Sequence, residues 1–565
     1  MLDKPWWELW PGRLELELKA LESAGIKCER DEPAFSKEKF IRLRLHFPWR
    51  GKIVILVAVF PPFYPYFRPE VYAEPGTFPR HQNPMEGNLC LLGRRSQNWN
   101  SEWTLADLLN NQFPLLERAA LTKDRMERES IEEPLGEPVT TYYSYCPGSM
   151  VIIDSSKQVG SEHKAGGITV LVQPESMPAV RAQVVDVRAQ NGKRLFSFDI
   201  CPSQGKEIPA SWIRLSEPPF VKTPREFEKH LIEKHAIAPA KFTHKLGTWF
   251  IDIIGILVPE ELQQGVSGDG WMFLVRLKQE KTLESRTELV RAGRAGRIDF
   301  DVRTPTLSFL HNKRITLVGL GSIGAPIAME LARSGIGEIS LIDFDFVEPG
   351  SVVRWPLGNS AFGLQKTVAM KQFIKSNYPF TKAEAVEYRF GTNYLPDFNV
   401  NLQKALSQAD LLIDATTEFG IHQFLSDYAR ISKKPFLYAF LTPGAYGGLV
   451  ACIDSAKEMG CWHCLQIALL KDKSLPEPPF LENADVQPVG CAERTSIFAG
   501  FDAIEISLEA TRMAISVLSN GTKEQYPKSK WDVAIAKFRS DAGEQIPPSW
   551  TTYPLNRNLL CPACK

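Results

Sequence analysis

The chain has 565 residues, of which 44% are hydrophobic, 23% charged and 10% aromatic. At roughly 150 residues per domain this length predicts about three to four domains. The composition is that of a globular protein with large cores, which excludes global disorder. The 66 basic and 66 acidic residues cancel, so no overall field draws the chain to nucleic acid or to an anionic membrane.

The amino-terminal sequence MLDKPWWELWPGRLELELKA lacks the basic segment and the continuous apolar stretch of a secretory signal peptide. The longest apolar runs, residues 53–60 and 249–258, are too short to cross a bilayer. We therefore expect a soluble, cytoplasmic protein. Its ten cysteines are too sparse for a secreted disulfide scaffold, and four of them form two C-x-x-C pairs, which in the cytoplasm indicate metal or redox chemistry.

Composition changes near residues 124–148 and 286–312, which divides the chain into three predicted domains, 1–135, 150–300 and 305–565. The first begins with a predicted helix and continues with two strands, a proline-rich crossing and a further helix, over residues 11–25, 40–47, 52–60, 61–69 and from 104 onward.

The middle domain has strand-like runs at residues 168–172, 184–187 and 273–277, and a helical pattern near 224–234. It contains no catalytic constellation. We expect an α/β linker domain that positions the two ends of the chain.

One cysteine of the first domain lies in an extended segment, FPRHQNPMEGNLCLLG. Thioester exchange needs a thiolate that carries the acyl group and a donor that stabilises the developing oxyanion. Cys90 suits the first role and Asn83 the second, whereas His81 holds the loop. The alternative is that Cys90, between Leu89 and Leu91, is a buried small hydrophobe.

These residues resemble a ubiquitin-conjugating enzyme domain over residues 1–135. The prolines of the crossing, the His81–Asn83 tripeptide and the helix start at Trp103–Leu105 match that family. Gln82 stands where the family has proline, and the interval between Asn83 and Cys90 is one residue shorter than in the family. The resemblance implies an α+β fold with Cys90 as the catalytic cysteine.

In the third domain an apolar strand over residues 315–318 runs into the glycine-rich sequence GLGSIG, followed by a helix and a second strand that ends at Asp343. In this context Gly319 permits a tight turn, Gly321 lets phosphate approach the backbone and Gly324 allows close helix packing. Asp343 suits a ribose hydroxyl. The pattern predicts a Rossmann-like nucleotide site.

The residues after the second strand favour adenylation over hydride transfer. Asp345, Arg354 and Lys366 supply another carboxylate and two cations, which a magnesium-bound triphosphate requires and an NAD site does not. Residues 305–565 resemble the ThiF-like adenylation domain shared by ubiquitin-activating enzymes and bacterial activators of sulfur carriers. The resemblance implies that Asp343 contacts the ribose of ATP, that Asp345 lies near magnesium, and that Arg354 and Lys366 bind phosphates.

Two positions depart from the adenylation family. Ser351 stands where the family has asparagine. In LLIDATTEFG the family's second acid after Asp414 falls on Thr417. Asp414 is a further candidate for the nucleotide site, and Glu418 is the candidate to replace the missing magnesium carboxylate.

The C-x-x-C pairs, at Cys461 with Cys464 and Cys561 with Cys564, are typical of zinc knuckles. Four thiolates brought together by the fold make a closed tetrahedral zinc site. A redox disulfide pair, or cysteines packed in the core without metal, are the alternatives.

Cys491 lies alone in QPVGCAERTSIF, before a helical pattern that starts around Ser496. A thiol near a helix N-terminus ionises more easily, which suits a nucleophile. In ubiquitin-activating relatives a cysteine in this part of the chain receives the activated C-terminus. The resemblance therefore implies that Cys491 is a second catalytic cysteine; the alternative is a buried structural cysteine.

A conjugating-type and an activating-type domain on one chain imply a relay. ATP adenylates a protein C-terminus, Cys491 takes it as a thioester, Cys90 receives it by transthiolation, and a target amine completes the transfer. Covalent linkage raises the effective concentration of the two cysteines.

This domain order resembles the ubiquitin-transferase-like ancillary proteins of CBASS antiviral defence systems. That resemblance implies a cGAS-like nucleotidyltransferase as the protein with the activated C-terminus, cellular target proteins or amines as acceptors, and an isopeptidase-like partner that reverses the attachment. Relatives of the adenylation domain commonly form homodimers, which we expect here.

Two other functions stay open. A sulfur-carrier adenylyltransferase would use Cys491 to handle sulfur, but that chemistry does not need the conjugating-type cysteine. A non-catalytic scaffold that senses ATP would not need Lys366, Arg354 or either proposed catalytic cysteine, although Thr417 is compatible with it.

Overall fold

The computed structural model describes residues 4–564 apart from 39, 92–98, 125, 128–130, 132–135, 199–204, 264, 283, 392–395, 455–456, 458, 487–494 and 524–525. The chain divides into two compact units, the second of which begins its main segment at Gly296. This division falls within residues 286–312, where the composition changes. The region predicted as the first domain, and the region predicted as the middle domain up to Ala295 apart from residues 199–203, belong to the first unit. The limits predicted for the domains stay predictions.

The first unit begins with helices and an antiparallel meander. Helices α1 (Trp6–Leu9) and α2 (Pro11–Ser23) precede strands β1 (Lys27–Arg30), β2 (Arg42–Trp49), β3 (Lys52–Val59) and β4 (Glu70–Tyr72), and α3 (Leu105–Leu121) follows. The strands pair in the order β1-β2-β3-β4, each antiparallel to its neighbour. The predicted order of helix, antiparallel strands, extended segment and helix is confirmed. The first predicted helix ends before Gly25 because that residue has a φ of 72°, in the left-handed region that terminates helices.

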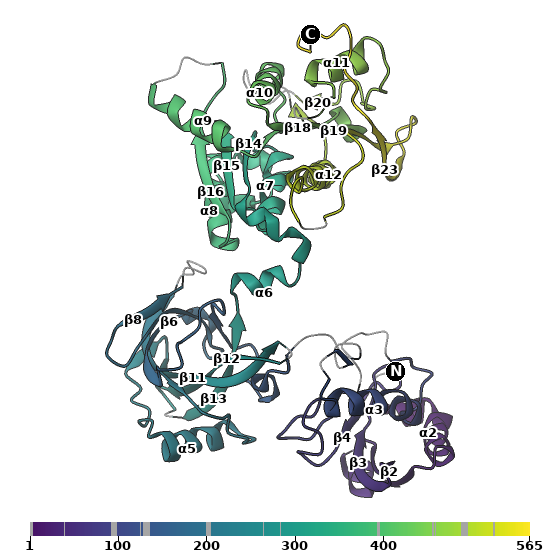
Figure 1. Cartoon of the computed structure of the whole chain (residues 1–565), viewed down its shortest axis with the longest axis vertical. Helices are drawn as coiled ribbons and strands as arrows, with labels where there is room; N and C mark the ends of the chain where they lie inside the picture. The colour runs from purple at the N-terminus through teal and green to yellow at the C-terminus, as the bar shows by residue number, and fades with distance from the viewer. Residues whose placement is uncertain are drawn as a thin grey trace. The chain divides into compact units, whose positions relative to one another are not determined.

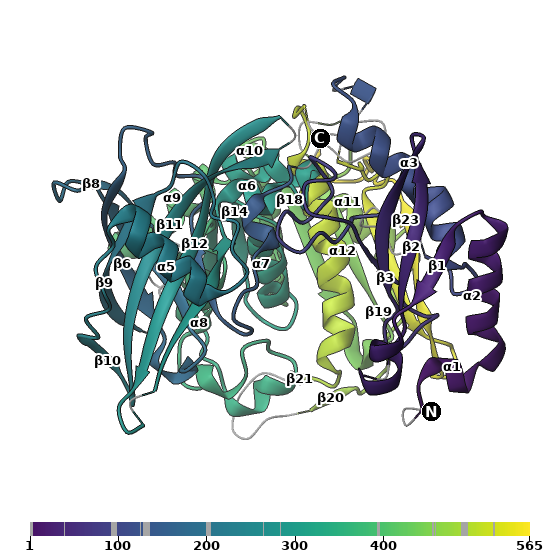
Figure 2. The same ribbon diagram turned by 90° about the horizontal axis from the view of Figure 1, so that it is seen from below.

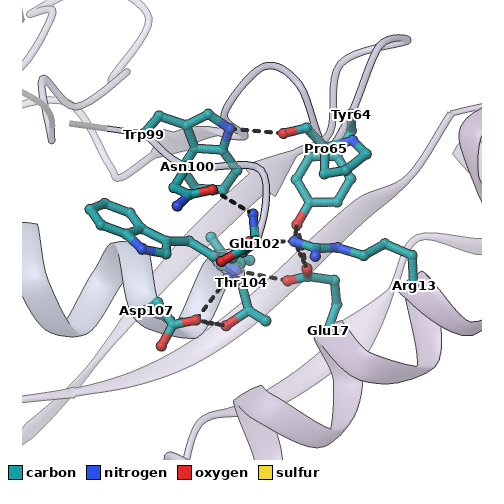
Figure 3. Close-up of polar contacts among 11 residues, drawn as sticks. Arg13, Glu17, Tyr64, Pro65, Trp99, Asn100, Glu102, Thr104 and Asp107 are labelled. Atoms are coloured by element: carbon teal, nitrogen blue, oxygen red, sulfur yellow. Dashed lines mark hydrogen bonds and ion pairs between the residues drawn. The ribbon is translucent and has the colours of Figure 1, made fainter. Parts of the chain in front are cut away.

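A fully buried carboxylate joins α2 to the start of α3 (Figure 3). The Oε2 atom of Glu17 accepts a hydrogen bond from Leu105 N at 2.7 Å. Its Oε1 atom accepts a hydrogen bond from the Tyr64 hydroxyl and lies 3.0 Å from Arg13 Nη2. Burial raises the pKa of Glu17, and the hydrogen bonds and the ion pair offset part of the cost of removing the carboxylate from water.

The rest of the first unit is dominated by strands. These are β5 (Met150–Ile153), β6 (Ala165–Val172), β7 (Arg181–Arg188), β8 (Arg194–Ser197), β9 (Lys206–Arg214), β10 (His244–Leu246), β11 (Trp249–Gln263), β12 (Val266–Gln279) and β13 (Ser285–Arg294). The sheet order is β10-β11-β12-β13-β5-β7-β6-β9, and β9 also pairs with β11, which closes the strands from β11 to β9 into a barrel.

The prediction of an α/β linker domain is therefore wrong in the share of helix, because the region consists mainly of β-strands. One long helix, α5 (Pro224–His235), accompanies the strands among the described residues of this barrel. Its buried Phe227 and Leu231 pack against β11, β12 and β13, and Figure 1 shows α5 beside these strands. The predicted strands were segments of longer ones, whose closure depends on pairing between distant parts of the chain.

The second unit is built on an eight-stranded sheet in the order β16-β15-β14-β17-β18-β19-β22-β23. Its strands are β14 (Arg314–Val318), β15 (Glu338–Asp343), β16 (Lys382–Glu387), β17 (Leu411–Asp414), β18 (Pro435–Leu441), β19 (Gly447–Asp454), β22 (Val533–Arg539) and β23 (Gln545–Tyr553). The strands from β16 to β18 are parallel. The chain moves outward from β14 to β16 and then returns to β17 on the other side of β14. This reversal makes the carboxyl end of β14 a topological switch point, where open α/β sheets bind ligands.

Helices cover both faces of this sheet. They are α7 (Gly324–Arg333), α8 (Lys366–Asn377), α9 (Pro396–Gln408), α10 (Phe419–Ile431), α11 (Trp462–Leu470) and α12 (Gly500–Leu518). The short helix α6 (Arg297–Asp301), which buries none of its residues, precedes the first strand of the sheet. One buried cluster joins α7, α8 and α12 to one face, and a second joins α9, α10 and α11 to the other. Figures 1 and 2 both show α7 and α12 side by side. The prediction of a Rossmann-like fold is confirmed.

The helix expected to start around Ser496 begins later. Thr495 and Ser496 form the short strand β21, which pairs with β20 (Asp485–Val486), and α12 begins at Gly500. Among the residues that the structure describes, no helix combines the length and the apolar character needed to cross a bilayer.

Replacing Glu17 tests the buried cluster. Glu17→Ala leaves Leu105 N without its carboxylate acceptor and Arg13 without its ion-pair partner, so we expect a loss of about 3 kcal/mol in the free energy of unfolding. Urea unfolding followed by circular dichroism measures it. Glu233→Ala is the control, because Glu233 and Lys229 form an exposed pair whose removal costs at most about 0.5 kcal/mol. Equal effects of the two substitutions would contradict the structural role of Glu17.

Candidate functional site

The glycine-rich turn lies at the switch point after β14. Gly319 has a φ of 88°, and a Cβ atom there would lie 2.9 Å from the carbonyl carbon of Ala415. A Cβ atom on Gly324 would lie 1.9 Å from the carbonyl oxygen of Gly319, whereas one on Gly321 would meet no atom within 4 Å. The fold itself therefore requires glycine at 319 and 324. Gly321 faces open space, where a phosphate can approach the backbone.

A carboxylate at the end of β15 holds this turn. Leu320 N donates to Asp343 Oδ2 at 2.6 Å, and Asp345 N donates to Asp343 Oδ1 at 2.8 Å. On the other side of the turn, the buried Trp355 donates from Nε1 to the Leu320 carbonyl at 2.8 Å. Sequence reasoning missed Trp355, which carries no motif. These bonds fix both the turn and the backbone of Asp345.

Asp345 and Lys366 form an ion pair beside the turn. Lys366 is the first residue of α8, and its Nζ lies 2.8 Å from Asp345 Oδ2. Lys366 N also donates to the Asp345 carbonyl at 2.9 Å. The structure thus brings together Asp343, Asp345 and Lys366, as the sequence predicted, around the carboxyl end of β15.

Arg354 has a different set of neighbours. Its Nη1 donates to the Ser496 carbonyl at 2.8 Å, and its guanidinium lies 4.8 Å from the ring centroid of Phe498. Burial lowers the pKa of Arg354. Ser496 belongs to β21, which with β20 flanks residues 487–494. Cys491 lies outside the described residues, and Arg354 contacts the chain immediately after that segment.

The carboxylate of Asp414 is fully buried and supports the loop after β17. Its Oδ1 accepts hydrogen bonds from Thr416 N at 2.9 Å and Thr416 Oγ1 at 2.8 Å, and its Oδ2 lies 2.8 Å from His422 Nδ1. Thr417 and Glu418 are exposed. His422, which sequence reasoning missed, is also buried. Asp414 therefore acts on the site by positioning the loop beside Gly319, and Glu418 is the accessible carboxylate of that loop.

Cys90 is exposed. Leu89 and Leu91 on either side are 3% and 2% exposed, so the extended backbone directs the leucines into the core and the thiol outward. The alternative that Cys90 is a buried hydrophobe is wrong. Cys90 N donates to the His81 carbonyl at 2.8 Å, which ties the cysteine to the loop before it.

The side chains of Gln82 and Asn83 shape that loop from inside. Gln82 Oε1 accepts from Phe78 N at 2.8 Å, and Gln82 Nε2 donates to the Glu74 carbonyl at 2.8 Å. Asn83 Oδ1 accepts from Met85 N at 2.9 Å and from Glu86 N at 3.2 Å. Gln82 thus supplies by hydrogen bonds the order that a proline would supply by its ring. Asn83 lies near the cysteine loop, and its oxyanion role stays a prediction.

The four cysteines of the C-x-x-C pairs converge between the start of α11 and the C-terminal segment. Their Sγ atoms all lie within 4.8 Å of one another. The Sγ–Sγ distances are 3.5 Å for Cys461–Cys561, 3.6 Å for Cys464–Cys564 and 3.9 Å for Cys461–Cys464. A zinc–sulfur bond of about 2.3 Å places tetrahedral ligands about 3.8 Å apart. The donor set therefore fits a structural zinc ion.

The surroundings of these sulfurs act in both directions on their ionisation. Asn558 N donates to Cys464 Sγ at 3.3 Å, a bond that favours a charged sulfur. Burial raises the pKa of the Cys461 thiol, so a nearby cation is needed to keep it ionised at neutral pH.

Metal analysis tests the cluster. We expect about one zinc per chain by mass spectrometry of the purified protein, with loss of the metal and a lower Tm in Cys461→Ala. Cys452→Ala is the control, because Cys452 lies outside the cluster. A wild-type chain whose Tm is the same with and without bound metal would contradict a structural zinc site.

Comparisons with known proteins agree with this arrangement. The model of the ThiF family matches residues 299–527. The sulfur carrier protein adenylyltransferase of Thermus thermophilus is 24% identical over 45% of this chain and 83% of its own length. The ATP-dependent ubiquitin transferase-like protein Cap2 of Enterobacter hormaechei is 27% identical over 24% of this chain and 22% of Cap2.

A further relative matches along the full length. The uncharacterized protein y4oA of Sinorhizobium fredii is 31% identical over 98% of this chain and 97% of its own length. Because this similarity includes both compact units, it concerns the whole architecture and not only the nucleotide fold. The chain therefore belongs to the same protein family as y4oA, and its residues 299–527 are a ThiF family domain.

Proposed function

We propose that this chain is an ATP-dependent, ubiquitin-transferase-like enzyme that activates a protein C-terminus and relays it through two cysteines to a target amine. One observation carries the proposal. The same chain contains a ThiF family domain, with its glycine turn at the switch point, and an exposed Cys90 held on an ordered loop. The similarity to Cap2 supports the ubiquitin-transferase part.

The first step is adenylation. A carboxylate oxygen of the substrate's C-terminus attacks the α-phosphorus of ATP, and the bond to the pyrophosphate oxygen breaks. Gly321 leaves room for the phosphates, Asp343 accepts a ribose hydroxyl, and Lys366 and Arg354 neutralise phosphate charge. Magnesium, when bound, would neutralise further charge. Asp345 and Glu418 are the exposed carboxylates of this edge that would hold it.

The following steps move the acyl group. The Cys491 thiolate attacks the acyl carbon and releases AMP, and the Cys90 thiolate then attacks the thioester and releases Cys491. An amine of the target attacks the Cys90 thioester, loses a proton and frees the thiolate. By resemblance to the CBASS proteins, the activated protein is a cGAS-like nucleotidyltransferase, an isopeptidase-like partner reverses the attachment, and the enzyme is a cytoplasmic homodimer.

A sulfur-carrier adenylyltransferase is the second candidate. It is favoured by the similarity to the Thermus enzyme, which extends over 83% of that protein. With this function the reaction would end at the acyl adenylate, or with sulfur handled at Cys491, and no acyl group would reach a second cysteine. It gives no role to the exposed Cys90, and the fate of Cys90 therefore separates the two functions.

The glycine turn provides a test of the nucleotide site. Gly321→Ala places a methyl group in open space, so we expect an unchanged Tm but ATP binding weaker by roughly tenfold, or about 1.4 kcal/mol. Gly324→Ala is the contrast, since its Cβ would clash with the backbone of Gly319 and should lower the Tm as well. Calorimetric titration with ATP and thermal unfolding measure both effects. Unimpaired ATP binding by Gly321→Ala would exclude this turn as the phosphate site.

The relay is tested by trapping the acyl group. In Cys90→Ser, expressed with its neighbouring genes, an oxyester on the introduced hydroxyl should outlive the native thioester. Intact mass and peptide mapping should find a base-labile protein adduct at position 90 that disappears when Cys491 is also replaced. The mass of the adduct identifies the substrate. If ATP is split to AMP and neither position carries an adduct, the transfer function is wrong and adenylation alone remains.

A further inference from the structure

The loop that presents Cys90 contains a strained residue. His81 has a φ of 60°, in the left-handed region that costs energy for a residue with a side chain. Its carbonyl accepts the hydrogen bond of Cys90 N at 2.8 Å. The conformation of His81 therefore sets the position of the Cys90 backbone, and it persists only where other contacts hold it.

The contact that holds His81 comes from a later part of the chain. His81 N donates to Glu137 Oε1 at 2.7 Å. The Tyr142 hydroxyl donates to the same oxygen, so two donors fix the carboxylate of Glu137. Burial and the Glu137 charge raise the pKa of Tyr142, and Cys90 contributes to that shift.

Glu137 and Tyr142 are in turn anchored on the barrel. Glu137 N donates to Glu261 Oε2 at 3.0 Å, and Arg80, next to His81, forms an ion pair of 2.7 Å with the same carboxylate. Burial opposes ionisation of Glu261, but hydrogen bonds that include those from Gly265 N and Arg80 outweigh it and lower its pKa. Glu261, near the end of β11, therefore binds both Arg80, next to His81, and Glu137, which accepts from His81 N.

Two further contacts make this anchoring firm. Thr140, between Glu137 and Tyr142, donates from Oγ1 to the buried Glu260 at 2.6 Å. Met85, in the turn that Asn83 closes, is buried in the barrel cluster together with Tyr143. The Cys90 loop and the segment from Glu137 to Tyr142 are thus packed on one surface of the barrel.

We propose that Glu137 is the positioning residue for Cys90, that it acts by accepting the hydrogen bond of His81 N, and that Tyr142 holds it in place. The barrel then completes the transfer site of the conjugating-type region instead of only joining the two ends of the chain. This inference rests on the proposed function of Cys90 as an acyl carrier. It adds two residues to the site that lie outside the region 1–135 resembling a conjugating enzyme.

Three variants of the full chain separate the effect of the Glu137 acceptor oxygen, which positions the Cys90 loop, from the effect of the Glu137 charge. Glu137→Ala removes the acceptor, whereas Glu137→Gln keeps an oxygen for His81 N and removes only the charge. Tyr142→Phe removes the donor that steadies Glu137. Tyr145→Phe is the matched control, because the Tyr145 hydroxyl donates to the Thr140 carbonyl and not to Glu137.

The functional measurement is single-turnover discharge of the Cys90 adduct to free lysine as the probe amine. Glu137→Ala should slow discharge by roughly 10- to 100-fold, the cost of a misplaced reacting group. Tyr142→Phe should slow it less, while Glu137→Gln and Tyr145→Phe should stay near the wild-type rate. ATP–pyrophosphate exchange by the second unit should be unchanged in all four variants, which shows that the rest of the chain is intact.

Hydrogen exchange provides a readout that does not depend on acyl transfer. Peptides covering residues 78–91 should exchange faster in Glu137→Ala and not in Glu137→Gln or Tyr145→Phe. A wild-type discharge rate in Glu137→Ala, or discharge equally slow in Glu137→Gln, would overturn the proposal. If the wild-type chain forms no adduct at Cys90, the proposed function fails, and the exchange comparison alone decides whether Glu137 orders the loop.

Discussion

The nucleotide site depends on the carboxylate of Asp343. Its two oxygens receive the N–H groups of Leu320 and Asp345, one from the glycine turn after β14 and the other from the segment after β15. Hydrogen bonds to a charged group contribute about 1.5–3 kcal/mol each. One side chain therefore fixes both the glycine turn and the segment that begins at Asp345. The position of Lys366 follows, because its backbone and side chain both bind Asp345.

The same principle operates at Cys90, where backbone geometry is set from a distance. Cys90 makes its backbone hydrogen bond to His81, and His81 is held by Glu137. Both sites thus rely on a carboxylate that accepts backbone N–H groups. At Cys90 this hydrogen bonding adds to the apolar contacts of Leu89 and Leu91 with the core, and the thiol itself stays exposed.

Sequence patterns predicted the parts of this molecule that depend on local signals. The helical periodicity of residues 11–25, the apolar strand before GLGSIG and the acid after the next strand are all local, and the structure has each of them. Asp345 and Lys366 were candidates for one nucleotide site through the resemblance to adenylation domains, but their ion pair is visible only in the structure. Trp355 and Glu137 could not be predicted, since each acts through a contact with a residue far away in sequence. His422 lies only eight residues after Asp414, but it belongs to no motif that would mark the contact. Closure of the barrel was also missed, because the parallel pairing of β9 with β11 leaves no local pattern.

The cysteine pairs show the same limit. Each C-x-x-C pair predicted a knuckle, but only the fold shows that Cys461 faces Cys561 and Cys464 faces Cys564. The start of α12 was predicted too early, around Ser496 instead of Gly500, for a related reason. The polar and apolar spacing after Cys491 continues a helical pattern, yet Thr495 and Ser496 pair with β20, and a tertiary pairing of this kind overrides local preference.

Gln82 has a thermodynamic consequence for the Cys90 loop. A proline makes a loop rigid in every state of the chain, because its ring also restricts the unfolded ensemble and so reduces the entropy lost on folding. Gln82 leaves the unfolded chain unrestricted and acts on the loop through side-chain hydrogen bonds to Phe78, Ala73, Glu74 and Gly87. The contribution of Gln82 to the order of this loop therefore exists only while the surrounding turn is folded. Local opening of that turn removes this contribution, whereas a proline would keep its restriction in the opened state.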